Sequence, residues 1–338
     1  MSSPDRPSSP RGARPTSGGG TPSGGQGRAN AQQKAQKAKA PQLRAPTADP
    51  ARLAAYDVLS AVRERDAYAN LVLPGLLRER RLDTRDAAFA TELAYGALRG
   101  RGLLDAVLQA CVDRPLAQLD PPVLDVLRLG AHQLLRMRTP VHAAVSATVD
   151  LARRVTTAGP AALVNAVLRK VAAQDLDEWL AHLEPEDDVV GALALRHSHP
   201  RWIASAFRDA LRGDLDQTAL ALEADDARPQ VHLVARTVDR DELAAASEGT
   251  PGPWSPYAVR LEGGGDPGDV DAVRDGRAGV QDEGSQLVAL ALAGAPLEGP
   301  DRLWVDLCAG PGGKAALLQA LGDQRGAVLV ACEVQPHR

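Results

Sequence analysis

The chain has 338 residues, a length that predicts two or three domains. Its 39 basic and 43 acidic residues nearly balance, which excludes a uniformly basic protein of the histone kind. Its three cysteines lack CxxC spacing, which excludes a disulfide framework and a cysteine-based metal cluster.

No apolar run reaches the roughly 18–20 residues of a membrane span, and the N-terminus lacks a hydrophobic signal core. We therefore expect a cytoplasmic protein without a membrane partner. Residues 1–47 are predicted to form a disordered basic tail. Ser, Pro, Gly, Gln and Ala dominate this tail, and its eight Lys and Arg residues accompany a single Asp.

Residues 48–173 are predicted to form a compact all-helical domain. Apolar residues recur there at helical spacing, and no alternating strand pattern interrupts them. The first helix begins at Asp49-Pro50, an N-cap residue followed by proline at the first helical position. Further helices are predicted from Asp86 and over 104–111, 121–134, 142–155 and 160–171.

Residues 174–275 are predicted to form a small α/β linker domain. Helices are expected near 186–196, 200–211 and 215–223, strands over 231–235 and 257–261, a helix from 239 to 249, and a loop over 263–269. Strand and helix signals alternate in this part of the chain, in contrast to the helical domain that precedes it.

Residues 276–338 are predicted to form the start of a doubly wound nucleotide-binding sheet. A helix over 283–293 precedes an apolar strand over 303–307, a glycine-rich turn, a helix over 315–321 and a second apolar strand over 327–332. Uninterrupted apolar strands are typical of parallel strands that are covered on both faces. Because two strands cannot bury themselves, we expect the chain to end inside this last domain.

The glycine-rich turn, DLCAGPGGK at 306–314, is the candidate ligand site. A Walker A loop would need Gly at position 308 and Ser or Thr at position 315, so Cys308 and Ala315 disfavour an ATPase loop. A dinucleotide spacing fits Gly310, Gly312 and Ala315, and Glu333 follows about 20 residues later, where an acid accepts ribose hydroxyls. The residues alone therefore leave two classes open: an NAD-dependent dehydrogenase and an S-adenosylmethionine-dependent methyltransferase.

The same segment resembles the DxCAxPGGK cofactor loop of the RNA cytosine-5 methyltransferases of the RsmB (Sun/Fmu) family. GVQDEGSQLVA at 279–289 and HSHPRWI at 197–203 resemble further segments of that family. Residues 48–173 are similar to its NusB-like RNA-binding domain, most clearly in the stretches VHAAVSATVDLAR and LVNAVLRKV.

The resemblance implies S-adenosylmethionine as the cofactor and ribosomal RNA as the partner. The loop around the methionine and ribose end of the cofactor would consist of Cys308, Ala309, Gly310, Pro311, Gly312, Gly313 and Lys314. Glu333, at a position where the family usually has Asp, would bind the ribose diol. Asp306 would orient the loop or the ammonium group of the donor.

The implied reaction is methylation of carbon 5 of a cytosine in ribosomal RNA, with a cysteine thiolate adding to carbon 6. The family places the nucleophile in a T-C motif and a helper cysteine in a P-C motif, and neither occurs here. We therefore expect the catalytic cysteine beyond Arg338 and no methyl transfer by this fragment. Cys308 is assigned to the cofactor loop, and Cys111 and Cys332 are expected in cores.

The alternative function is a non-catalytic RNA-binding protein built on the NusB-like domain. In either case RNA phosphates are expected to meet a basic patch in the helical domain, formed by Arg99, Arg101, Arg153, Arg154 and Arg169. His197 and His199 lack a third ligand nearby, so no metal site is expected. The protein is expected to be a monomer.

Overall fold

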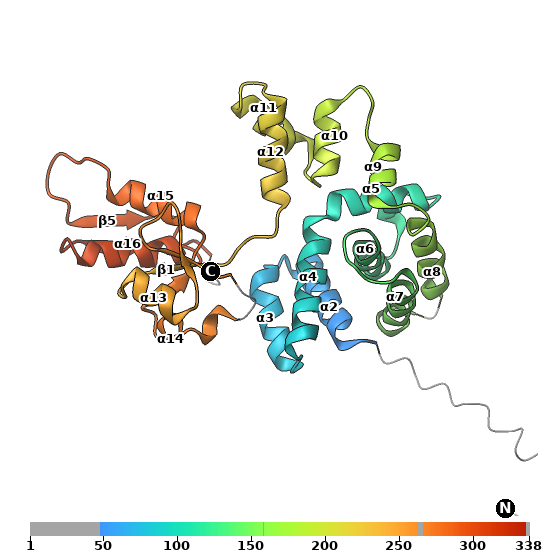
Figure 1. The fold of residues 1–338 in the computed structure, drawn as a ribbon, viewed down its shortest axis with the longest axis horizontal. Helices are drawn as coiled ribbons and strands as arrows, with labels where there is room; N and C mark the ends of the chain where they lie inside the picture. The colour runs from blue at the N-terminus through green and yellow to red at the C-terminus, as the bar shows by residue number, and fades with distance from the viewer. Residues whose placement is uncertain (1–47, 158, 263–265, 336–338) are drawn as a thin grey trace, which may run out of the picture. The chain divides into compact units, whose positions relative to one another are not determined.

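A computed structural model describes residues 48–157, 159–262 and 266–335, and the predicted tail at 1–47 lies outside the described residues. The described chain is mostly helical, and its strands all lie after residue 231 (Figure 1). No helix in the described ranges is long and apolar enough to cross a membrane.

Helices alone build the first part of the described chain. They are α2 (Pro50–Arg65), α3 (Ala69–Glu79), α4 (Thr84–Arg99), α5 (Arg101–Cys111), α6 (Pro121–Leu135), α7 (Val141–Val155) and α8 (Pro160–Val171), with a 3-10 turn at Leu116–Gln118. The predicted helix from Pro50 is confirmed, and the Asp49 side chain accepts hydrogen bonds from Ala51 and Arg52 at its start. The helical class expected for this region is confirmed.

Two details of this region differ from the prediction. Helix α3 was not predicted, since Pro74 lies inside it and no side chain caps its start at Tyr68. Helix α4 begins at Thr84 and not at Asp86, because Asp83 is its N-cap and accepts a hydrogen bond from the Asp86 N–H. One core joins these helices, and its fully buried members include Leu93, Leu104, Leu127 and Leu168.

Four short helices follow: α9 (Leu176–Leu183), α10 (Val189–Arg196), α11 (Arg201–Ala210) and α12 (Leu215–Asp226). Helices α10 to α12 share a small core of their own that contains Ala204 and Leu222. Asp226, the last residue of α12, is paired with Arg136 beyond the end of α6 at 2.8 Å. This half-buried ion pair joins the second group of helices to the first.

A four-stranded sheet comes next, with strand order β2-β3-β1-β4 and only antiparallel neighbours. Its elements are β1 (His232–Ala235), α13 (Arg240–Ala246), β2 (Thr250–Pro251), β3 (Ala258–Arg260), a 3-10 turn at Pro267–Asp269, α14 (Asp271–Arg274) and β4 (Ala278–Val280). Successive side chains of a strand point to opposite faces. Leu233 accordingly packs with α13 and α14, whereas Val234 packs with the elements that follow β4.

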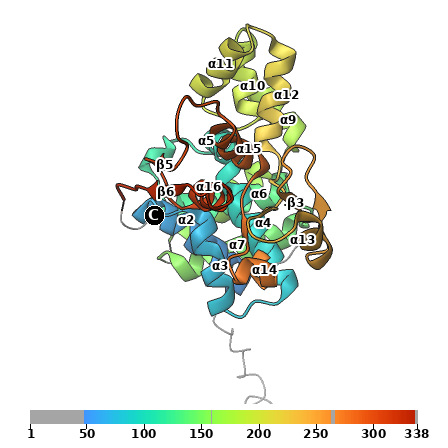
Figure 2. The same ribbon diagram turned by 90° about the vertical axis from the view of Figure 1, so that its left-hand side faces the viewer.

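The last elements are α15 (Glu283–Ala293), β5 (Leu303–Asp306), α16 (Gly313–Asp323) and β6 (Val328–Ala331). Strands β5 and β6 pair in parallel, as the sequence predicts, and α16 is the crossover between them. Helix α16 lies beside α15 (Figure 2). It packs against Trp304 and Leu329 of the strands. The described part of the chain therefore contains a complete β-α-β unit.

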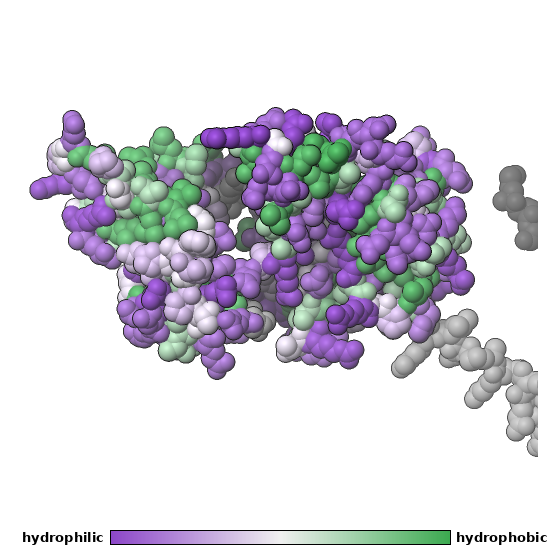
Figure 3. Space-filling view, turned by 45° about the horizontal axis from the view of Figure 1, so that its top comes forward, coloured by the Kyte–Doolittle hydropathy of each residue, from purple (hydrophilic) through white to green (hydrophobic). Residues whose placement is uncertain are grey.

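Only one face of this two-stranded sheet is covered in the described chain, in agreement with the expectation that two strands cannot bury themselves. The opposite face exposes Leu303, Val305, Val328 and Val330. An apolar area is visible over this part of the molecule (Figure 3). Cys332 was expected in a core and is instead exposed, because it continues the alternation of Val328 and Val330 on the uncovered face. Cys111 is buried in α5, as predicted.

Candidate cofactor site

The candidate loop starts from the carboxyl ends of two parallel strands. The register sets Asp306 of β5 opposite Ala331 of β6, so both strands end at the same edge. Hydrogen bonds then continue the pairing beyond the strands. The Cys332 N–H donates to the Asp306 carbonyl at 2.8 Å, and the Ala309 N–H donates to the Cys332 carbonyl at 2.9 Å. The loop is thereby fixed against the segment that follows β6.

Glu333 lies directly against the loop. Its Oε2 accepts a hydrogen bond from the Gly310 N–H at 2.9 Å, and its Oε1 accepts one from the Gln335 N–H at 2.9 Å. These two backbone hydrogen bonds hold the carboxylate beside the loop. Two groups that the sequence analysis selected 23 residues apart thus lie in direct contact.

Gly312 provides the turn into α16. Its φ of +105° lies in the left-handed region, which favours glycine, and a Cβ built on it meets nothing within 4 Å. The Gly312 N–H donates to the Ala309 carbonyl at 2.6 Å. No side chain caps α16 at this residue. The first N–H groups of the helix therefore remain available to an anionic ligand group, which the helix dipole also favours.

Asp306, at the end of β5, contacts the loop through its carboxylate. Its Oδ1 accepts a hydrogen bond from the Cys308 N–H at 3.0 Å, whereas its Oδ2 is buried and has no hydrogen-bond partner. A buried carboxylate oxygen without a partner costs free energy, so a cationic donor near it would be favourable. Cys308 is exposed, and Lys314 lies in the first turn of α16.

A segment before the loop also contributes, and its contacts were missed by the sequence analysis. The Gln281 side chain lies against Gly313, whose ideal Cβ would be 4.0 Å from both Cγ and Cδ of Gln281. Gln281 is buried, and its Oε1 has no hydrogen-bond partner. Asp282 caps α15 by accepting from the N–H groups of Gly284 and Ser285. The available signal was the VQDEGSQ run itself, which was noted only as a resemblance.

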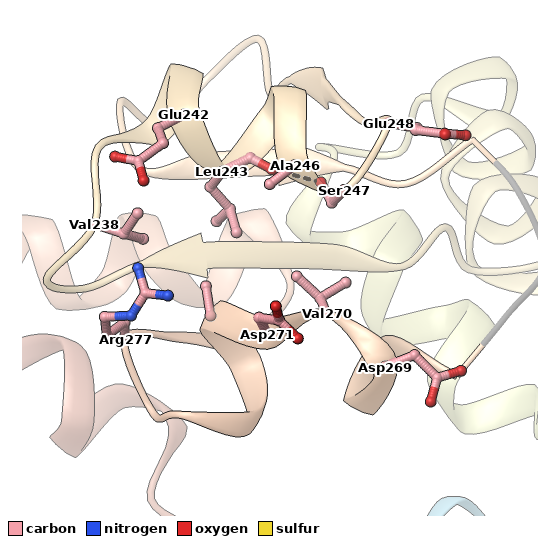
Figure 4. Close-up of a pocket in the computed structure, with 11 residues that line it drawn as sticks. Val238, Glu242, Leu243, Ala246, Ser247, Glu248, Asp269, Val270, Asp271 and Arg277 are labelled. Atoms are coloured by element: carbon pink, nitrogen blue, oxygen red, sulfur yellow. Dashed lines mark hydrogen bonds between the residues drawn. The ribbon is translucent and has the colours of Figure 1, made fainter.

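A separate hollow of about 470 Å³ lies between α13 and the segment around α14 (Figure 4). Glu242, Glu248, Asp269 and Asp271 line it together with Arg277 and apolar side chains. None of its lining residues belongs to the 306–314 loop or to the segment around Glu333. This hollow is therefore distinct from the candidate cofactor site.

The five arginines of the predicted basic patch lie on four helices, with Arg99 at the end of α4 and Arg101 at the start of α5. Arg153 and Arg154 lie in the last turn of α7, whereas Arg169 lies in the last turn of α8. Because α7 and α8 are joined by the short segment 156–159, these two turns are at opposite ends of the helix pair. Arg101 instead borders a hollow of about 450 Å³, where it lies 3.6 Å from Asp105.

His197 and His199 do not gather further ligands. The nearest carboxylate oxygen to His199 Nε2 that forms an ion-pair contact is that of Asp225, at 3.7 Å. Burial lowers the pKa of His197 below its usual value, which favours the neutral imidazole. Across the ranges that the structure describes, no three His, Cys, Asp or Glu side chains are placed to hold a metal ion.

Known proteins match both the helical domain and the residues that follow it. A model described as the NusB family matches residues 49–173. Putative methyltransferase Rv1407 of Mycobacterium tuberculosis is 54% identical over 294 residues, which cover 86% of this chain and 64% of that protein. Ribosomal RNA small subunit methyltransferase B of Pseudomonas syringae pv. tomato is 32% identical over 292 residues, which cover 84% of this chain and 62% of that protein.

The chain thus spans less than two thirds of the length of either relative. Both matches extend well beyond the helical domain, and the names of both proteins are those of methyltransferases. The crystal structure of PH0851 has a TM-score of 0.66 with this chain, at 17% identity, and the match covers 86% of this chain and 65% of that one. This likeness shows a shared fold across most of the described residues.

Proposed function

We propose that this chain, a homologue of ribosomal RNA small subunit methyltransferase B that carries a NusB family domain, binds S-adenosylmethionine and serves the methylation of carbon 5 of a cytosine in ribosomal RNA. The observation that carries the proposal is the contact of Glu333 with Gly310, since it places an acceptor for hydroxyl groups beside a glycine-rich helix start. The names of the relatives confirm the resemblance to the RsmB family that the sequence indicated.

The residues of the site fit this donor. The uncapped start of α16, after Gly312, offers N–H donors to the carboxylate of its amino-acid end. Asp306, with its unpartnered Oδ2, offers a buried negative charge to the ammonium group. Glu333, after the second strand, would accept hydrogen bonds from the ribose hydroxyls. The remaining loop residues assigned to the donor are Cys308, Ala309, Gly310, Pro311, Gly313 and Lys314.

The bound donor would supply an electrophilic methyl group, and the residues of this chain would hold it in a fixed orientation. Orientation of a reactant is a large part of the rate enhancement in group transfer. The proposal gives the covalent addition to carbon 6 to none of the three cysteines, because none lies in a T-C or P-C motif. Residues 306–333 are thus assigned to donor binding alone.

The proposal also assigns the parts of the chain. Residues 48–173 form the NusB-like domain, which would contact RNA, and residues 174–275 link it to the donor-binding part. Residues 276–338 supply the first unit of a Rossmann-like sheet, supported by the parallel pairing of β5 and β6 around α16. A parallel β-α-β unit with its ligand at the carboxyl ends of the strands is typical of nucleotide-binding sheets.

Titration calorimetry on the 338-residue chain tests the proposal. S-adenosylmethionine is expected to bind, and NAD is expected to give no heat of binding at the same concentration. The unmethylated product S-adenosylhomocysteine should compete with S-adenosylmethionine for the same site, because the two share every group that the loop contacts. Binding of NAD without binding of S-adenosylmethionine would refute the proposal, as would the absence of binding by both.

A further inference from the structure

We propose that Trp254 is a stacking platform for an unstacked base of the substrate RNA, held in place by the segment that also supports the cofactor loop. The inference rests on the proposed function and adds to it a residue that contacts the substrate. Trp254 lies in none of the sequence motifs described above and outside the candidate cofactor site.

Trp254 is unusual because a large aromatic side chain is left in solvent. It is 75% exposed, whereas Trp179 and Trp304 are buried in cores. Burial of a tryptophan normally stabilises a protein by several kcal/mol, so there is a cost in leaving one outside. Trp202, on α11, is exposed to a similar extent, at 72%. It provides a matched comparison on a different element.

The backbone that presents Trp254 is firmly held. Glu283 is buried, and its Oε1 accepts hydrogen bonds from the N–H groups of Trp254 at 2.6 Å and Ser255 at 2.7 Å. Gly252 is enclosed, since a Cβ on it would lie 2.5 Å from Ala258 Cβ. Charge-assisted hydrogen bonds to a buried carboxylate are among the stronger ones in proteins. The backbone that carries the exposed indole is therefore fixed.

A second buried side chain extends this anchoring. Gln286 is fully buried, and its Oε1 accepts a hydrogen bond from the Ser255 hydroxyl at 2.7 Å. Its Nε2 donates to the carbonyl of Gln281 at 3.0 Å and to that of Leu233 at 3.3 Å. Fully satisfied buried polar networks make a local structure rigid. A backbone that is ordered before binding loses little conformational entropy when a ligand stacks on the side chain that it carries.

The same segment reaches the cofactor loop. Gln281, whose carbonyl accepts from Gln286, has its side chain against Gly313 at the start of α16. Residues 281–286 therefore contact the loop of Trp254 on one side and the candidate cofactor loop on the other. A base stacked on Trp254 would be held by the same rigid element that positions the methyl donor.

An RNA base is the occupant that these observations favour. Acidic residues outnumber basic ones between residues 228 and 335, so phosphate contacts alone are a poor explanation of RNA binding there. Stacking on an aromatic ring needs no positive charge and contributes about 1–3 kcal/mol per base. Sequence-specific RNA recognition commonly uses unstacked bases in this way.

The test measures fluorescence anisotropy of a labelled 12-nucleotide single-stranded RNA and of the same sequence in a duplex. In the full chain, Trp254→Ala should weaken single-strand binding about 5- to 150-fold, the equivalent of one stacked base. Trp254→Phe should retain most of the affinity, and Trp202→Ala should leave it unchanged. Duplex binding should not respond to Trp254→Ala, because paired bases offer no free face.

Two further measurements distinguish this inference from the proposed function. The ratio of wild-type to Trp254→Ala affinities should stay constant as salt is raised, since stacking releases no counterions. Calorimetry should show unchanged S-adenosylmethionine binding by Trp254→Ala. Equal single-strand affinities of the Trp254→Ala and Trp202→Ala variants would overturn the stacking role even if the cofactor binds. Loss of cofactor binding in the wild type would instead refute the proposed function.

Discussion

Glu333 and Gly310 are separated by 23 residues of sequence and joined by a hydrogen bond of 2.9 Å from the Gly310 N–H to Oε2 of the carboxylate. The bond exists because two parallel strands end side by side and each is followed by one of these residues. It connects the glycine-rich loop to the acid after the second strand, so both sides of the proposed donor site are fixed relative to each other.

Replacement of Glu333 tests this connection. Glu333→Gln removes the charge while keeping the shape, and we expect S-adenosylmethionine to bind about 10- to 100-fold more weakly, because a charged hydrogen-bond acceptor contributes about 1.5–3 kcal/mol. Glu333→Asp should give an intermediate value, since the carboxylate remains but is shorter by one methylene. The control is Glu298→Gln, on an exposed loop residue. Calorimetric affinities of Glu333→Gln and wild type that agree would contradict the assignment.

Gly312 is expected to matter through its backbone conformation. Its Cβ position is open, so Gly312→Ala causes no clash, but a residue with a side chain at φ +105° costs about 1–3 kcal/mol. We expect reduced stability together with weakened donor binding. Gly299 has φ +117° and an equally open Cβ position outside the site. Gly299→Ala should therefore reduce the denaturation midpoint to a similar extent and leave calorimetric binding unchanged. Equal loss of binding in both variants would argue against a role of the loop.

The helical domain contains a glycine that is required for packing. A Cβ on Gly96 of α4 would lie 2.2 Å from Nε2 of the buried His132 on α6. Gly96→Ala should therefore destabilise the protein by about 1–3 kcal/mol, as expected for overpacking. Gly75 of α3 has nothing within 4 Å of its Cβ position, so Gly75→Ala should stabilise by up to about 1 kcal/mol. Urea denaturation followed by circular dichroism measures both, and destabilisation by both variants would be inconsistent with this packing.

The three thiols should react at two different rates. Burial raises the pKa of Cys111, which lowers the fraction of reactive thiolate at neutral pH and also blocks access. Cys308 and Cys332 are exposed. A colorimetric disulfide reagent at pH 8 should therefore label two thiols quickly and the third only after unfolding in denaturant. Rapid labelling of all three thiols in the native protein would show that the environment of Cys111 is described wrongly.

One carboxylate of the helical domain should make stability dependent on pH. The imidazole of His132, whose Nε2 lies 3.8 Å from the carboxylate, holds the pKa of Glu92 below its usual value. The stability that follows from this shift is present above the ordinary carboxyl pKa of about 4.3 and is lost as the pH falls through the lowered value in the folded protein. Glu92→Gln should therefore differ from wild type by up to about 1 kcal/mol at pH 6 and by less near pH 3. A difference that is the same at both pH values, measured by urea denaturation, would contradict this.

Signals that lie within a few residues determined much of the structure. Asp49, Asp239 and Asp282 each accept backbone hydrogen bonds at the start of a helix, a pattern that needs only local sequence. The apolar runs after Arg302 and Ala327 predicted two strands, and the turn between them was identified from its glycines. The family resemblance also depended on contiguous segments.

Contacts between distant segments were decided only by the tertiary structure. The hydrogen bonds from the loop of Trp254 to Glu283, and the pairing of β4 with β1, join residues whose spacing in the sequence carries no periodic signal. The exposure of Cys332 likewise depends on which faces of β5 and β6 are covered. Local propensity specifies where a helix or strand begins, whereas burial and hydrogen bonding between elements depend on which surfaces meet in three dimensions.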